Sequence, residues 1–336
     1  MSRPTGDDDW IDAYEESLDQ QESGNKPRTK HRPRHDDAEK ALVIGVDRGR
    51  YRLQLESGTA VTANRAKELR REAVVVGDSV DVVGDLSGEE GTLGRVVRIH
   101  PRRNVLRRSA DDTDQFERVI VANADQLLMV VATKDPEPRS RLIDRYLVAA
   151  LDAGITPILC ITKTDLSPAE PLLDYARGAG IEAFALRTDG QEDDLDKLRE
   201  TLAHKTTVTV GHSGVGKSTL VNRLVPGASR DVGGVNVHTG RGRHTSSSSR
   251  ALALGQGGWI IDTPGVRSFG LGHVTPEAID QGFPDLQDYL AQCPRGCQHQ
   301  EPDVDCALRQ AAENAESTTA ARIDSLIRLR ALAGSS

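Results

Sequence analysis

The stretch GHSGVGKST at residues 211–219 has the G-x-x-x-x-G-K-[ST] spacing of a loop that binds phosphate groups. A β-rich run precedes it and a helical pattern follows, which is the setting that such a loop requires. The glycines allow backbone N–H groups to face phosphate oxygens, and Lys217 is expected between the β- and γ-phosphates. The stretch predicts a nucleoside triphosphate site formed by Gly211, His212, Ser213, Gly214, Val215, Gly216, Lys217, Ser218 and Thr219.

Magnesium ligands are expected at three places around this phosphate loop. The Ser218 hydroxyl is expected to bind Mg²⁺ directly, and Asp262, in the stretch DTPG, is expected to bind it through water. The Gly265 N–H is then placed to contact the γ-phosphate. Between these elements lies the polar stretch GRGRHTSSSSR, in which Thr245 can complete the Mg²⁺ coordination when the γ-phosphate is present. The alternative for this stretch is a plain flexible loop.

The stretch TKTD follows an apolar run and predicts which purine is bound. A carboxylate at Asp165 can accept both the N1–H and the exocyclic amine of guanine, whereas adenine offers no such donor pair. Lys163 can lie along the base and the phosphate loop. Thr162 replaces the Asn that usually begins this motif, and we expect a looser tie to the phosphate loop. The predicted guanine-binding element is Thr162, Lys163, Thr164 and Asp165.

These elements occur in an unusual order along the chain. The guanine-binding element comes first, followed by the phosphate loop, Thr245 and DTPG, whereas an ordinary GTPase begins with the phosphate loop. The order predicts a circularly permuted GTPase. A permutation leaves the site intact when the original termini lie close together.

Three of the four cysteines cluster near the C-terminus, in CPRGCQHQEPDVDC at residues 293–306. The spacing is C-x₃-C-x-H-x₆-C, and three thiolates with one imidazole match a closed, tetrahedral, structural zinc site. The alternative is a loop of reduced, unligated cysteines. The fourth cysteine, Cys160, lies in an apolar run and is expected to be a small core residue. The predicted zinc ligands are Cys293, Cys297, His299 and Cys306.

Five short β-rich runs between residues 41 and 100, separated by Gly, Asp and Asn turns, predict a small barrel, and an OB-fold fits the strand count. Residues 40–110 carry 14 basic and 9 acidic side chains in a chain of net charge −8. Arg48, Arg50 and Arg52 can line a nucleic-acid face, with Tyr51 as the one aromatic residue that can stack on a base. An ordinary solvated barrel surface is an equal alternative. The stretch 101–110 is expected to be a basic linker.

Alternating strand and helix patterns from about residue 118 to 275 predict a mostly parallel α/β sheet with binding loops at the carboxyl ends of its strands. Strands are expected at 127–133, 156–162, 181–186, 206–211, 250–255 and 258–263, and helices at 141–154 and 194–203. The expected domains are a disordered tail at 1–39, an OB-fold at 40–105, a circularly permuted GTPase domain at 112–275 and a helical zinc-binding domain at 276–336.

Composition restricts the class of protein. No apolar run approaches the roughly 20 residues of a membrane helix, and the acidic, polar start is not typical of a signal peptide. Four cysteines with this clustering do not form a disulfide framework. We therefore expect a cytoplasmic protein without a membrane partner.

The order of these motifs, with a barrel before them and a Cys/His cluster after them, resembles the ribosome small-subunit-dependent GTPase A (RsgA) family over roughly residues 41–332. The stretches ANADQLLMVVA, TKTD, GHSGVGKST, GRGRHT and DTPGVRSFG carry the resemblance. It implies an OB-fold, a permuted GTPase domain and a zinc-bearing C-terminal domain. It also implies a monomer that binds the 30S subunit and its 16S rRNA during late maturation, cycling between GTP and GDP with Mg²⁺, with hydrolysis stimulated by the subunit.

Val266 follows DTPG, at the position where many GTPases carry the Gln that orients the attacking water. Valine cannot hydrogen-bond that water, so slow intrinsic hydrolysis is expected. His244 and Thr245 are the candidate catalytic residues, although His244 also fits an exposed loop position. The alternative is that ribosomal RNA or protein orders the polar stretch around Thr245. An RNA-binding module with a nucleotide sensor is a second interpretation of the chain, and an ATP-driven enzyme, which Asp165 disfavours, is a third.

Overall fold

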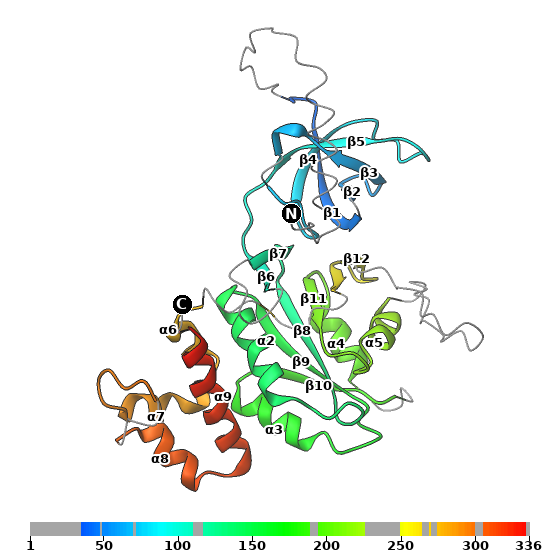
Figure 1. Ribbon diagram of the computed structural model, residues 1–336. Coiled ribbons are helices and arrows are strands. Elements are labelled where there is room, and N and C mark those ends of the chain that lie inside the picture. Colours follow the sequence, from blue (N-terminus) through cyan, green and yellow to red (C-terminus); the bar gives the residue numbers. More distant parts are fainter. Residues whose placement is uncertain are drawn as a thin grey trace, which may run out of the picture. The chain divides into compact units, whose positions relative to one another are not determined.

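The computed structural model describes residues 35–47, 49–69, 72–109, 117–188, 194–225, 249–263, 269, 274–299 and 305–333. Most of its strands join one sheet of eleven strands, in the order β10-β9-β8-β11-β13-β12-β1-β2-β3-β5-β4 (Figure 1). β4 also pairs with β1, which closes the last five strands of this series into a barrel. The sheet therefore contains an α/β part and a barrel, joined by the antiparallel pairing of β1 with β12.

The barrel consists of β1 (Glu39–Asp47), β2 (Arg50–Leu55), β3 (Ala60–Arg65), β4 (Ser79–Gly84) and β5 (Gly94–Ile99). All its pairings are antiparallel except β3 with β5. Alternate side chains face inward and form one apolar core, because successive residues of a strand point to opposite sides. The predicted five-stranded OB-fold is confirmed.

The alternation also places the side chains of β2. Tyr51 lies in the barrel core with Leu53, and its burial raises the pKa of its hydroxyl. Arg50 and Arg52 are exposed on the outer face. Tyr51, the one aromatic residue of this segment that could stack on a base, is therefore not available to do so.

The segment after the barrel is not the linker that its basic composition suggested. β6 (Val105–Ser109) pairs antiparallel with β7 (Glu117–Ala122) in a separate two-stranded sheet. Just before it, Arg102 makes two hydrogen bonds of 2.7 and 2.8 Å to the fully buried carboxylate of Asp78. Gly77 has a left-handed φ of 91°, and a Cβ there would lie only 2.0 Å from the Ala122 carbonyl oxygen. This close backbone approach requires glycine.

The α/β part is a parallel sheet of β8 (Gln126–Ala132), β9 (Thr156–Thr162), β10 (Glu182–Ala185), β11 (Thr206–Val210) and β13 (Trp259–Asp262), with β12 (Arg250–Ala253) antiparallel to β13. The helices are α2 (Ser140–Asp152), α3 (Glu170–Gly178), α4 (Leu195–Leu202) and α5 (Lys217–Leu224). One apolar core lies under α2 and α3, and another under α4 and α5, so helices cover both faces (Figure 1). This explains why every residue of β8 is buried.

The C-terminal helices are α6 (Pro276–Gln281), α7 (Gln287–Gln292), α8 (Ala307–Asn314) and α9 (Ser317–Ala333), orange to red in Figure 1. Ile323, Leu326 and Leu329 of α9 belong to the same apolar core as α2 and α3. Among the described residues, no helix is long and apolar enough to cross a membrane.

A buried polar network joins α9 to the α/β part. Arg322 donates to Asp144 on α2 at 3.2 Å and makes bonds of 2.6 and 2.7 Å to Asp285. Asp144 also accepts hydrogen bonds from Tyr175 on α3, at 2.6 Å, and from Ser325 on α9. Burial raises the pKa of Asp144, and these donors oppose that effect because they favour the ionised carboxylate. Arg322 is therefore the residue on which the packing of the C-terminal helices most depends.

We expect Arg322→Met to lower the free energy of unfolding by about 3–5 kcal/mol, because it leaves two partly or fully buried carboxylates without their cation. Urea denaturation followed by circular dichroism measures the effect. Arg177→Met is the matched control, since Arg177 makes an exposed ion pair with Asp174 and should change stability by less than about 1 kcal/mol. Equal unfolding midpoints for the two variants would show that the network does not stabilise the fold.

Candidate nucleotide site and metal cluster

The carboxyl ends of four parallel strands meet at one edge of the sheet and bring the predicted elements together. β9 ends at Thr162, opposite the last residue of β8, and β13 ends at Asp262, opposite Thr209 of β11. The phosphate loop starts directly after β11. The guanine-binding element, the phosphate loop and Asp262 therefore share the edge at which α/β sheets bind ligands.

The phosphate loop has the backbone that its glycines allow. Gly214 and Gly216 have left-handed φ values of 86° and 90°, and Gly216 is the N-cap of α5. A Cβ at Gly211 would lie 2.6 Å from the Val130 carbonyl oxygen, so the loop requires the absence of a side chain there. His212 directs its Nδ1 to the Ser213 carbonyl oxygen at 2.9 Å, while Ser218 and Thr219 are exposed.

Lys217 and Asp262 meet at the phosphate end of the site. The Lys217 ammonium donates to the Thr263 carbonyl oxygen at 3.0 Å and lies 3.1 Å from Asp262 Oδ1. Thr209 directs its hydroxyl to Asp262 at 3.4 Å, and the Thr263 hydroxyl donates to the Thr209 carbonyl oxygen at 2.8 Å. Lys217 and Asp262 therefore form an ion pair beside the loop that is predicted to bind phosphate.

The guanine-binding element contacts the phosphate loop directly. The Thr162 hydroxyl donates to the Val215 carbonyl oxygen at 2.6 Å, so Thr in place of Asn retains a close tie, contrary to the looser one expected from the sequence. Asp165 is exposed and accepts a hydrogen bond from the Thr188 N–H at 2.6 Å. The Thr164 N–H donates to the Leu186 carbonyl oxygen at 3.2 Å. The backbone of 186–188 therefore lies beside the carboxylate that is predicted to bind the base.

The sequence analysis missed one residue at this edge. Thr133 follows β8 and is 6% exposed, and its hydroxyl donates to the Lys163 carbonyl oxygen at 2.7 Å. A hydroxyl-bearing residue directly after the apolar run 127–132 was the signal that could have identified it. The predicted residues His244, Thr245, Gly265 and Val266 lie outside the described residues, and so does most of the predicted tail.

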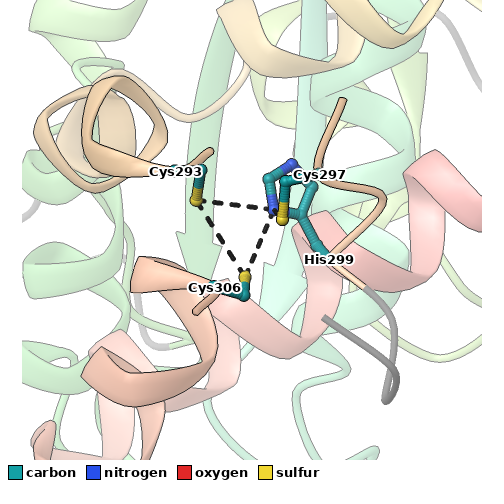
Figure 2. A group of neighbouring side chains, drawn as sticks. All are labelled: Cys293, Cys297, His299 and Cys306. Atoms are coloured by element: carbon teal, nitrogen blue, oxygen red, sulfur yellow. Dashed lines mark hydrogen bonds between the residues drawn. The ribbon is translucent and has the colours of Figure 1, made fainter. Parts of the chain in front are cut away.

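The four predicted metal ligands converge beside α7 and α8 (Figure 2). Their ligand atoms all lie within 4.8 Å of one another. His299 Nδ1 lies 3.4 Å from the sulfurs of both Cys297 and Cys306 and 3.7 Å from that of Cys293. His299 and Cys306 are buried. Burial and the neighbouring thiols raise the pKa of Cys297 to about 12, so the thiolate form depends on a cation. The group could hold a metal ion.

Comparison with known proteins assigns the chain to a protein family. A family model described as RsgA GTPase matches residues 99–272. A small ribosomal subunit biogenesis GTPase RsgA from Chromohalobacter salexigens is 43% identical over 263 residues, which cover 76% of this chain and 74% of that protein. The chain belongs to the RsgA GTPase family. The protein of the same name from Haemophilus influenzae strain 86-028NP is 35% identical over 322 residues, 91% of each chain.

Solved structures agree with the RsgA assignment. YloQ, described as a circularly permuted GTPase, has a TM-score of 0.61 and 25% identity and covers 92% of this chain and 98% of its own. YjeQ from Thermotoga maritima has the same fold, with a TM-score of 0.61 and 24% identity over 86% and 99% of the two chains. The predicted permuted fold is confirmed, and as an RsgA family member the chain is a GTP hydrolase.

We expect the purified chain to carry about one metal ion, and Cys306→Ser to lose most of it, because a buried ligand of a four-ligand site is removed. Elemental analysis by inductively coupled plasma mass spectrometry measures the content. Cys160→Ala is the control, since Cys160 is buried in β9 outside the cluster and its loss should leave the metal in place. A Cys306→Ser protein with undiminished metal would refute the assignment.

Proposed function

We propose that this GTPase acts in late maturation of the small ribosomal subunit, where it binds the 30S particle and hydrolyses GTP to GDP and phosphate at a rate that the particle increases. The observation that carries the proposal is the meeting of Thr162, Val215 and Asp262 at one sheet edge in a chain 43% identical to a small ribosomal subunit biogenesis GTPase.

Each part of the site has a proposed role. Lys217 binds the β- and γ-phosphates, and the N–H groups of the phosphate loop surround them. Asp165 accepts the two guanine donors, and the Thr188 N–H orients its carboxylate. Ser218, Asp262 and Thr245 hold Mg²⁺, which offsets charge on the phosphates when bound. His244 and Thr245 act in hydrolysis, and the Gly265 N–H contacts the γ-phosphate.

The Cys/His cluster is a proposed structural zinc site. Three thiolates and one imidazole are a ligand set that zinc takes with four-fold coordination, which leaves no position open for a substrate. The cluster lies between α7 and α8, whose residues are distant in sequence from the phosphate loop. Zinc there would stabilise the C-terminal helices.

The proposed nucleic-acid partner is 16S rRNA, bound through the barrel by phosphate contacts. Arg50 and Arg52 are exposed on β2, and Arg98, which pairs with Asp81 at 3.0 Å, is 60% exposed on β5. With Tyr51 buried, stacking contributes little, so these cations should bind backbone phosphates and confer a strong salt dependence. We further propose that the protein acts as a monomer in the cytoplasm, without a membrane partner.

We expect the rate of GTP hydrolysis to rise at least about tenfold with increasing 30S concentration, because Val266 cannot orient the attacking water. Phosphate release measured against subunit concentration tests this. Thr245→Ala should abolish most of the increase, while Thr207→Val, a change at the opposite edge of the sheet, should retain it. No stimulation would favour the alternative of an RNA-binding module in which the nucleotide only reports a state.

We expect Asp165→Asn to move nucleotide preference from guanine towards xanthine by roughly 100-fold, because the amide donates where the carboxylate accepts. Competition of GDP and XDP against a fluorescent nucleotide measures the preference. Asp174→Asn, an exposed carboxylate on α3, is the control and should leave it unchanged. An ATP-driven enzyme would show no such shift.

A further inference from the structure

Thr133 holds both of the first two carbonyls of the guanine-binding element. Its N–H donates to the Thr162 carbonyl oxygen at 3.0 Å, which extends the β8–β9 ladder by one bond. Its hydroxyl donates to the Lys163 carbonyl oxygen at 2.7 Å. Any residue except proline can supply the first bond, but the second needs a side-chain donor, which here is the Thr133 hydroxyl.

The bond to Lys163 supports a backbone conformation that a residue with a side chain rarely adopts. Lys163 has a φ of 59°, in the left-handed region, which costs about 1–2 kcal/mol for a residue other than glycine. Such a conformation persists only where neighbouring groups hold it. Here the Lys163 carbonyl oxygen also accepts the Leu166 N–H at 2.9 Å, so the two bonds fix the turn from which Asp165 projects.

The residues after Thr133 also lie beside Lys163 and the phosphate loop. The Lys163 ammonium donates to the Asp135 carbonyl oxygen. A Cβ added at Gly214 would lie 3.6 Å from Cδ of Pro136, so Pro136 is close to the phosphate loop. The segment 133–136 therefore lies against both the base end and the phosphate end of the site.

We propose that Thr133 is a positioning residue for guanine recognition. Its hydroxyl fixes Lys163 in the left-handed turn, and this directs the Lys163 side chain along the phosphate loop and the Asp165 carboxylate toward the base. Thr133 itself does not touch the nucleotide. The proposal rests on the role of Asp165 in binding guanine that is proposed above.

The test compares the affinities of the full chain for GDP and IDP, because IDP lacks the exocyclic amine that Asp165 is proposed to bind. We expect the wild-type protein to prefer GDP by at least about tenfold, since a charged acceptor is otherwise left without its donor. Thr133→Val keeps the shape of the side chain and removes the hydroxyl. It should weaken GDP binding and lower the ratio of the affinity for GDP to the affinity for IDP (the GDP/IDP ratio) by about threefold to tenfold. Thr133→Ser, which restores the hydroxyl, should return the ratio to within about twofold of wild type.

Thr207→Val is the matched control. Thr207 is also buried, and its hydroxyl donates to Gln126 Oε1 at 2.8 Å near the start of β11, away from the sheet edge where Thr133 lies. It should lose stability without any change in the GDP/IDP ratio. Thermal unfolding of every variant is recorded, and Thr133→Ala replaces Thr133→Val if the valine protein does not fold.

The outcomes separate the two proposals. A wild-type protein with equal affinity for GDP and IDP overturns the role of Asp165 and, with it, that of Thr133. A wild-type preference that Thr133→Val and Thr133→Ala leave unchanged overturns the role of Thr133 alone. A lower ratio in the valine variant that serine does not restore also overturns it, because the effect would then come from packing and not from the hydroxyl.

Discussion

The parallel alignment of β8, β9, β11 and β13 is the constraint on which this site depends. Parallel pairing places all four carboxyl ends at one edge, so Thr162, the phosphate loop and Asp262 meet whatever their order along the chain. A permuted GTPase is therefore possible because the sheet, and not the chain order, determines which groups are neighbours.

Helix α2 connects this sheet to the C-terminal helices through three consecutive residues. Asp144 belongs to the buried network with Arg322, Arg145 donates to the Phe269 carbonyl oxygen at 3.2 Å, and the Tyr146 ring packs edge-on against that of Phe269 at 5.6 Å. Phe269 follows DTPG in the chain and is fully buried. Phe269 is thus anchored on the same helix that packs against α9 through the Asp144–Arg322 pair.

Local chemistry was predictable from the sequence, and contacts between distant residues were not. Glycine spacing predicted the phosphate loop, and three cysteines with one histidine predicted a cluster that the fold does bring together, because each pattern is complete within a short stretch. Thr133 and Arg322 were missed, since their partners lie 30 and up to 178 residues away. The burial of Tyr51 follows from the two-residue period of β2, in which it alternates with the exposed Arg50 and Arg52.

The residues predicted to bind the base and those predicted to bind phosphate follow different strands. β8 and β9 hold the guanine-binding element, whereas β11 and β13 hold Lys217 and Asp262. The hydrogen bond from the Thr162 hydroxyl to the Val215 carbonyl oxygen joins these two parts. Because the acceptor is a backbone atom, the bond does not depend on the side chain at position 215. In the proposed function, Val266 after DTPG leaves hydrolysis dependent on the subunit, while the residues proposed to bind guanine follow other strands.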